Sequence, residues 1–200
     1  MGNPNNGNAA GPLAGGRREI NWDGGGGVSA TALAGTPFNG FLNTRGAQFT
    51  TLGSGFIQGT PEGFATQFGN ASLSTSLADF SPLRIFSPIG SNVTDIGFFI
   101  PGPNAASQPA TVTGFGAIFT DVDLPNSTSI EFFDIHNNSI FSQAVLPGTV
   151  PNGSFSFLGI ANAVERIFHV RITSGIGPNT EAGGVDDALL LECLSRRQHF

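Results

Sequence analysis

The clearest hydrophobic pattern in the chain is a strict alternation of apolar and polar residues in the segment RIFHVRIT. Phe168, Val170 and Ile172 fall on one side of an extended chain. Ile167, His169 and Arg171 fall on the other side. Because side chains alternate between the two faces of a β-strand, this segment predicts a strand with its apolar side toward a core.

A second segment, TVTGFGAIFTDVD, is apolar on both sides over much of its length. A strand of this kind is typical of a sheet centre that is covered on both faces. Its glycines have no side chain to pack, and glycine inside a strand often marks an irregularity. We therefore expect a central strand with a bulge or bend near Gly114 or Gly116.

Helical periodicity is nearly absent, because Gly or Pro interrupts almost every window of about eleven residues. Short strands separated by turn residues fit the chain better. The pattern predicts an all-β fold, an antiparallel two-sheet sandwich, with strands at 18–22, 46–51, 55–58, 84–87, 95–100, 110–124, 129–135, 140–146, 154–160, 166–173 and 185–193.

Length and composition suggest how these strands are organised. A chain of 200 residues fits a single domain, here residues 17–194. Residues 1–16 are rich in Gly, Asn and Pro and predict a disordered leader. Residues 195–200, SRRQHF, break the apolar pattern and predict a frayed or artefactual tail.

The charge pattern and the single Cys argue against several classes of partner and site. The net charge is −6, Lys is absent, and the paired arginines lie near the ends of the sequence, so no basic face for nucleic acid is indicated. No apolar run is long enough to span a membrane or to act as an export signal. A single Cys excludes an internal disulfide and a thiolate zinc site. No feature indicates an oligomeric state.

Several segments after residue 80 resemble a group of bacterial proteins. They are FSPLRIFSPIGSNVTDIGFFIPG, PATVTGFGAIFTDVDLPNSTSIEFFDIHNNSI, FSFLGI and RIFHVRITSG. Their order resembles uncharacterised secreted proteins of the type associated with the PEP-CTERM sorting signal. The resemblance covers more than half of the chain and implies a jelly-roll sandwich similar to carbohydrate-binding and galactose-binding-like modules. It also implies a secreted, extracellular protein, although no sorting signal follows the final strand pattern.

The stretch INWDGGGG is a candidate ligand loop. A jelly roll brings the first and last strands side by side, so Asn21 and Asp23 could meet Asp186 and Asp187. Several carboxylate and carbonyl oxygens in a glycine-rich loop suit calcium, which needs six to eight oxygen ligands. We therefore consider a structural calcium at these four residues. The alternative is an ordinary Asp-Gly turn and a solvated strand start.

A second acidic group combines Asp121 and Asp123 with Asp134 of the following predicted strand. Alternation sends the first two to one face, and a hairpin would bring the third near them. Such carboxylates could act as catalytic acid and base or bind a metal. The alternative is a hairpin whose carboxylates are simply solvated.

The polar side of RIFHVRIT supplies the third group. His169 and Arg171 could orient a sugar or a carboxylate, and His169 could act as a general base beside Glu131 or Asp134. The alternative for His169 is a surface histidine whose hydrogen bonds are satisfied. Trp22, the single Trp of the chain, is added as a ligand-binding candidate because indole rings are common at wet binding surfaces.

These candidates support three hypotheses. The first is a secreted β-sandwich binding module directed at carbohydrate or the cell surface and stabilised by calcium. The second is a small hydrolase of an ester, lactone or glycosidic bond that uses an acidic metal site or a carboxylate/His pair to activate water. The third is a structural extracellular protein. The Phe content, 19 residues, also fits a small apolar ester or lactone ligand.

Overall fold

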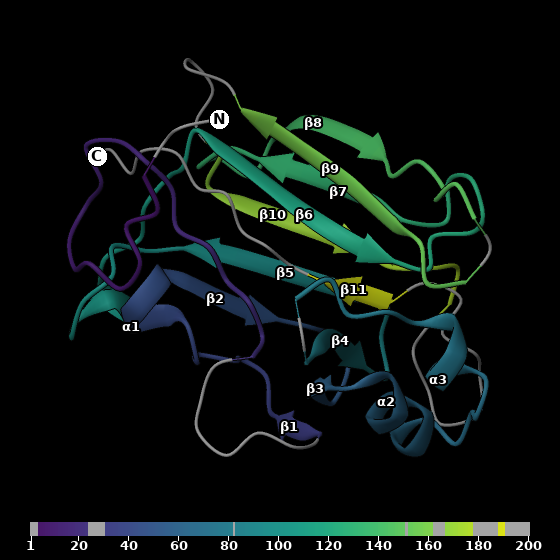
Figure 1. Ribbon diagram of the computed structural model, residues 1–200. Helices are drawn as coiled ribbons and strands as arrows, with labels where there is room; N and C mark the ends of the chain where they lie inside the picture. Colours follow the sequence, from purple (N-terminus) through teal and green to yellow (C-terminus); the bar gives the residue numbers. More distant parts are fainter. Residues whose placement is uncertain are drawn as a thin grey trace.

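A computed structural model of the protein describes residues 4–23, 31–81, 83–150, 152–161, 167–177 and 188–190. In these parts of the chain, strands form two antiparallel sheets and three short α-helices and one 3-10 turn connect them (Figure 1). The strands are β1 (Ala32–Ala34), β2 (Ala47–Thr50), β3 (Gly55–Gly59), β4 (Ile85–Ile89), β5 (Val93–Phe98), β6 (Gly114–Thr120), β7 (Ser129–Phe133), β8 (Ser139–Ala144), β9 (Phe155–Ala161), β10 (His169–Thr173) and β11 (Ala188–Leu190). The helices are α1 (Leu42–Arg45), α2 (Pro61–Gln67), α3 (Leu73–Ser76) and η1 (Ala105–Ser107).

The strand order is that of a jelly roll. The six-stranded sheet runs β1-β3-β4-β11-β6-β9 and the five-stranded sheet runs β2-β5-β10-β7-β8. From β4 onward the chain crosses between the sheets at most connections, so strands far apart in sequence become neighbours. The strands β4-β11-β6-β9 of the first sheet and β5-β10-β7-β8 of the second have the order of the two four-stranded sheets of a jelly roll, and β1, β3 and β2 extend these sheets at one edge. The predicted antiparallel two-sheet sandwich is therefore confirmed.

The positions of the strands follow the apolar pattern. Every predicted strand except 18–22 overlaps a strand of the structure. The longest prediction, 110–124, is shortened to β6 because Val112 makes only an isolated bridge to Ile167 and the backbone of Asp121 turns to a φ of 60°. The short edge strand β1 and the helices were not predicted.

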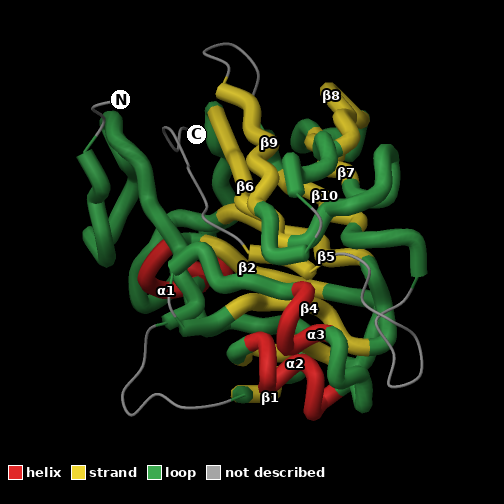
Figure 2. Tube along the Cα trace, turned by 45° about the vertical axis from the view of Figure 1, so that its right-hand side comes forward, coloured by secondary structure: helices red, strands yellow, loops and turns green. Residues whose placement is uncertain are grey.

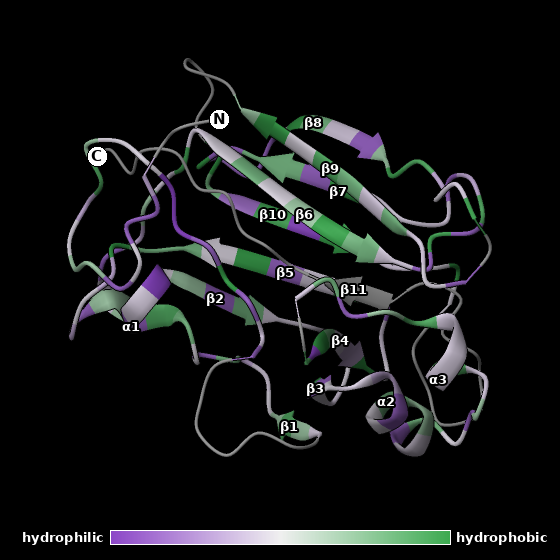
Figure 3. Ribbon diagram, in the orientation of Figure 1, coloured by the Kyte–Doolittle hydropathy of each residue, from purple (hydrophilic) through white to green (hydrophobic). Residues whose placement is uncertain are grey.

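The core lies between the sheets. Val170 and Ile172 of β10 point inward and are fully buried, as their alternation predicts. Phe168 is only partly buried and Ile167, expected on the opposite side, is fully buried, so the predicted alternation is wrong at the start of this segment. All seven residues of β6 are buried, which matches a strand covered on both faces. Figure 3 shows the alternation along β10 as green and purple bands. Burial of side chains of this size contributes about 1.5–3 kcal/mol each, so this layer is a main source of stability.

Helices α2 and α3 cover the outer face of β3 and β4 (Figure 2). Helix α2 starts at Thr60, whose Oγ1 accepts a hydrogen bond from the backbone N–H of Gly63 at 3.2 Å. Pro61 at the first helical position has the backbone angle that a helix start needs. Phe64 and Phe68 then pack on Ile57. Within the described residues, no helix has the length and hydropathy needed to cross a membrane.

Residues 4–16 differ from the disordered leader that their composition predicts. The Arg18 side chain is 1% exposed, and its Nη2 donates to the carbonyls of Ala9 and Gly11, at 2.8 Å each. Burial, with a further contribution from Arg45, lowers the pKa of Arg18 to about 10. Buried polar groups generally need hydrogen-bond partners, and here the leader's carbonyls provide them. The leader therefore completes part of the interior.

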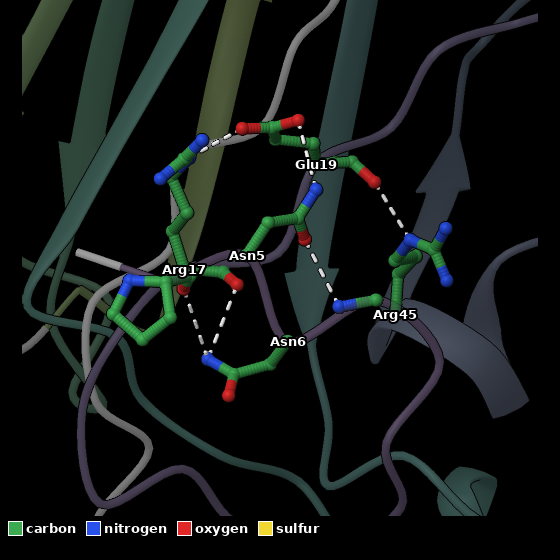
Figure 4. A network of polar contacts seen from close by, with 7 residues as sticks. Asn5, Asn6, Arg17, Glu19 and Arg45 are labelled. Carbon is green, nitrogen blue, oxygen red and sulfur yellow. Dashed lines mark hydrogen bonds and ion pairs between the residues drawn. The ribbon is translucent and has the colours of Figure 1, made fainter. Parts of the chain in front are cut away.

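A polar network holds the leader in place (Figure 4). The Glu19 carboxylate pairs with Arg17 and accepts a hydrogen bond from Asn5 Nδ2 at 2.9 Å. The Glu19 carbonyl accepts from Arg45 Nε at 2.6 Å, and Asn6 Nδ2 donates to the carbonyls of Gly15 and Arg17. The chain is thus fixed by side-chain contacts at residues 17–19, where a strand was expected. The single-domain boundary remains a prediction, and the predicted tail 195–200 lies outside the described residues.

Candidate functional site

Trp22 does not lie at a binding surface. Its side chain is 0% exposed and stacks on Phe86, with ring centroids 3.8 Å apart and planes 4° apart. Phe41 and Phe49 contact it edge-on. A ring that is fully enclosed by other rings cannot present a face to a ligand. The prediction of Trp22 as a ligand-binding residue is therefore wrong, because the apolar body of the indole is more stable in the core.

Asp23 ties the first loop of the chain to the segment before β4. Its carboxylate accepts hydrogen bonds from Ser81 Oγ at 2.7 Å and from the backbone N–H groups of Leu83 and Arg84 at 2.5 and 2.9 Å. These three bonds give Asp23 a structural role that needs no cation. Its neighbour Asn21 is exposed.

The calcium hypothesis also depends on two further acidic residues. Asp186 and Asp187 lie outside the described residues, so the structure does not show whether they meet Asp23. Among the residues that are described, no three His, Cys, Asp or Glu side chains form a group that could hold a metal ion. Calcium at Asn21, Asp23, Asp186 and Asp187 stays a prediction.

The second acidic group is not brought together. Asp121 is 3% exposed at the end of β6, and Asp123 is exposed in the loop that follows. Asp134 lies at the far end of β7, about 17 Å along the strand from where that loop enters it. The predicted hairpin is wrong because β6 and β7 belong to different sheets. Described residues therefore do not support a shared acid/base or metal site for these three carboxylates.

Asp134 has its own local function. Its carboxylate accepts hydrogen bonds from the backbone N–H groups of His136 and Asn138 at 2.8 Å each, and from Asn138 Nδ2 at 3.0 Å. The side-chain bond from Asn138, with the backbone bonds, lowers the pKa of Asp134. Asn and Asp commonly stabilise turns through bonds of this kind. Asp134 thus shapes the β7–β8 turn.

The structure does bring the third predicted group together, on the outer face of the five-stranded sheet. The paired residues form one line across all five strands, which we call the polar row. The polar row consists of Thr50 of β2, Asp95 of β5, Arg171 of β10, Glu131 of β7 and Ser142 of β8. Such directly opposed residues have Cβ atoms about 4.5–5.5 Å apart, so their side chains interact.

Arg171 is the centre of the polar row. Its Nε and Nη2 donate to the two carboxylate oxygens of Asp95 at 2.8 and 3.0 Å, a two-pronged pair. This hydrogen bonding raises the pKa of Arg171, and the charges of Asp95 and Glu131 raise it further against the effect of burial. The side chain of Arg171 is still 45% exposed. A guanidinium has five N–H donors, so donors remain for a ligand after the Asp95 pair is made.

A second line of paired residues, Gly97 of β5, His169 of β10 and Phe133 of β7, lies next to the polar row. His169 stacks on Phe133 of β7, with ring centroids 4.2 Å apart and planes 7° apart. On the other side His169 faces Gly97 of β5. A Cβ at Gly97 would lie 3.3 Å from the ring of Phe99, so the missing side chain makes room for that ring. The rings form a wall beside the charged groups.

Burial controls the protonation of His169. Partial burial lowers the pKa of His169, and Arg171 lowers it further, whereas Asp95 and Glu131 act in the opposite direction. The pKa therefore lies below the ordinary value, and the ring is neutral at neutral pH. A neutral imidazole offers one donor and one acceptor nitrogen.

Together these groups form a mixed surface of donors and acceptors on a rigid sheet. Two carboxylates and one guanidinium leave a charge of −1 when His169 is neutral. Such a surface suits a neutral ligand with several hydroxyl groups better than an anion. Sequence reasoning found Glu131, His169 and Arg171, but it missed Asp95 and Phe133. Their alternation within TDIGFF and IEFFD could have indicated the outward face, but strand pairing is not visible in one sequence.

Comparison of the chain with protein-family models, with curated proteins and with solved structures finds no match for it.

Proposed function

We propose that this β-sandwich is a secreted carbohydrate-binding module that binds its ligand on the polar row. The observation that carries the proposal is the Asp95–Arg171–Glu131 line beside the His169–Phe133 stack. Sugar hydroxyls both donate and accept hydrogen bonds. Carboxylates accept such bonds and a guanidinium donates them, so the polar row matches both functions of a hydroxyl.

The position of these groups also favours binding. They stand on strands of a sheet, whose backbone is fixed by hydrogen bonds on both sides in the case of β5, β10 and β7. Groups on rigid elements lose little freedom when a ligand binds. The Arg171–Asp95 pair fixes the guanidinium before any ligand arrives.

A binding screen tests the proposal. Glycan-array and polysaccharide pull-down measurements should identify a neutral glycan that binds the wild type. Arg171→Met should weaken that binding by about 10-fold to 100-fold, because a hydrogen bond to a charged group contributes about 1.5–3 kcal/mol. Arg17→Met is the matched control, since Arg17 also pairs with an acid, Glu19, but directly follows the leader and is not part of the polar row. Equal loss in both variants, or no glycan bound, would contradict the proposal.

The hydrolase alternative has one supporting feature, the neutral His169, which could act as a general base. Its carboxylate neighbours, Asp95 and Glu131, are separated by the β10 strand, so their backbones lie about 10 Å apart. Arg171 occupies the space between them and pairs with Asp95. Turnover of ester, lactone or glycoside substrates that is lost in His169→Gln would support the hydrolase, whereas binding without turnover supports the module.

A further inference from the structure

Among the described residues the sandwich has four edge strands, and these differ in how well they are protected from pairing with another strand. Strand β1 has only three residues. The outer side of β2 is bonded to Phe38, whose N–H and C=O pair with Phe49 at 2.7 and 3.1 Å. The pairing of β8 with β7 is broken by a bulge between Phe132 and Phe133. Short length, a covering segment and a bulge each prevent an edge from pairing with another strand.

Strand β9 has none of these protections among the residues described. It has seven residues in unbroken register with β6, and within the described chain β6 is its one partner. Its sequence, FSFLGIA, contains no charge and no Pro (Figure 3, where β9 carries no purple). Charged residues and Pro are the other common protections of an edge. Strand β9 is therefore an open edge that can accept a further strand.

The surface beside this edge is also apolar. Phe155 and Phe157 are 42% and 58% exposed, and Phe155 packs edge-on against Phe80 at 5.5 Å. The ring of Phe157 lies over Gly116 and Gly159, because a Cβ on either glycine would come within 2.9 Å of its tip. Exposed aromatic rings next to an unpaired strand edge indicate a contact surface.

We infer that a second copy of this chain pairs with β9 in antiparallel register, so that two six-stranded sheets become continuous. A two-fold axis at Leu158 places Phe157 opposite Gly159 of the second copy and Phe155 opposite Ala161 of the second copy. Each large side chain then meets a small one, which makes the strand complementary to itself. The same patch is used on both copies, so the assembly closes as a dimer and does not grow.

Charge favours β9 over other surfaces as the place where two copies of the chain meet. The chain carries a net charge of −6, so two copies repel each other in general. Strand β9 is a segment where they can meet without opposing like charges. The centre of the polar row, Asp95, Arg171 and Glu131, lies on the inner strands of the other sheet, so the dimer leaves both proposed binding surfaces accessible and is independent of the proposed function.

The contact through β9 is small for a specific dimer. Seven residues of strand extend about 24 Å. Figures 1 and 2 place β8 on the same side of the sandwich as β9, so the contact spans both layers, about 20 Å in height. About 500 Å² is buried on each copy, or about 1,000 Å² in total, at the lower end of specific interfaces. We therefore expect a dimer with a Kd in the micromolar range.

Sedimentation equilibrium of the full chain, from about 1 to about 300 µM, tests the inference. The wild type should fit a monomer–dimer equilibrium. Phe157→Lys should raise the Kd at least about 10-fold, because it places a charge inside the contact. Leu33→Lys is the matched control, since Leu33 is 60% exposed on β1 at the opposite edge of the same sheet. It should leave the Kd unchanged.

A second variant of β9 keeps the test decisive if Phe157→Lys does not fold. If circular dichroism shows that Phe157→Lys does not fold, Ala161→Lys at the exposed end of β9 takes its place with the same expected effect. A monomeric wild type at about 300 µM overturns the inference and leaves the edge to an extended segment of another protein. Growth into open-ended oligomers, or a Kd that neither β9 variant changes, overturns it as well.

Discussion

The outer faces of the two sheets differ in the side chains that they present. One carries polar residues, and the other is apolar and partly covered by helices. The outer face of the five-stranded sheet carries the polar row, where Arg171 lies between two carboxylates. The six-stranded sheet has α2 and α3 over β3 and β4, and beyond them it leaves Phe157 of β9 at the surface. A sheet face can be apolar only where another element covers it, so the bare part of the second face is the exception to explain.

This difference separates stability from function. Groups in the covered part of the six-stranded sheet are buried and their loss leaves a cavity. Groups of the polar row are solvated, so their loss changes stability little and ligand binding more. The aromatic residues on β9 belong to neither class, since they are exposed and apolar. Variants in the covered part of the six-stranded sheet, in the polar row and on β9 should therefore differ in their effects on stability and on binding.

The largest effect is expected under helix α2. Phe64 is 0% exposed and lies against Phe68 with ring centroids 5.8 Å apart. Phe64→Ala should lower the free energy of unfolding by about 3–5 kcal/mol, measured by urea denaturation, because it removes the transfer energy of the ring and leaves a cavity. Phe80→Ala, at a residue that is 45% exposed, is the control and should lose much less. Similar losses in both variants would mean that α2 does not cover the sheet.

A smaller loss is expected where the sheet is bare. A Cβ at Gly159 would lie 2.9 Å from the Cα of Gly116 and 2.9 Å from the ring tip of Phe157. A ring can move, but the backbone of a central strand cannot, so Gly159→Ala should destabilise the fold by about 1–3 kcal/mol. Gly35→Ala has no neighbour within 4 Å of the new Cβ and serves as control. A neutral Gly159→Ala variant would show that β6 and β9 are further apart than described.

The polar row should contribute little to folding. Removing the exposed Arg171–Asp95 pair with Asp95→Asn should change the free energy of unfolding by less than about 1 kcal/mol, as is usual for surface ion pairs. Glycan binding should weaken in the same variant because Arg171 loses its fixed position. Urea denaturation and binding measured on one preparation check both halves. A loss of several kcal/mol would assign the polar row to the core and contradict the comparison.

The fold was largely predictable because strand patterning is local. Alternation alone identified β10 and its inward residues Val170 and Ile172, and apolarity on both sides identified β6 as an interior strand. The bulge expected near Gly114 or Gly116 is absent from the pairing of β6 with β9. The order of strands within each sheet depends on pairings between residues far apart in sequence, which the pattern along one strand does not indicate. Helix α2 was missed although Thr60 and Pro61 form a recognisable helix start, because a seven-residue helix is too short for its periodicity to stand out.

The candidate site was less predictable for the same reason. Residues of one strand, His169 and Arg171, were assigned to one face correctly. Asp121 and Asp134 were combined because their segments follow each other, but the chain changes sheets between them. Trp22 was predicted at a binding surface because indole rings are common at such surfaces. The loop in fact turns its ring inward onto Phe86, a contact that no local pattern encodes.

The smallest effect concerns the pH dependence of stability at His169. Its pKa is lowered in the folded state by burial, so the unfolded chain binds a proton at a higher pH, near the ordinary value of about 6.5. As the pH falls below that value, the unfolded state takes up the proton first, and the free energy of unfolding decreases until the folded-state pKa is passed.

His169→Gln removes this group and keeps a polar side chain. The melting temperature of the wild type should therefore fall more between pH 7.5 and about pH 5.5 than that of His169→Gln. Because Asp95, Glu131 and Arg171 all face His169 and remain in the variant, the difference between the two curves isolates the imidazole. Parallel curves, or a wild type that gains stability on acidification, would show that the ring is not held neutral against Phe133.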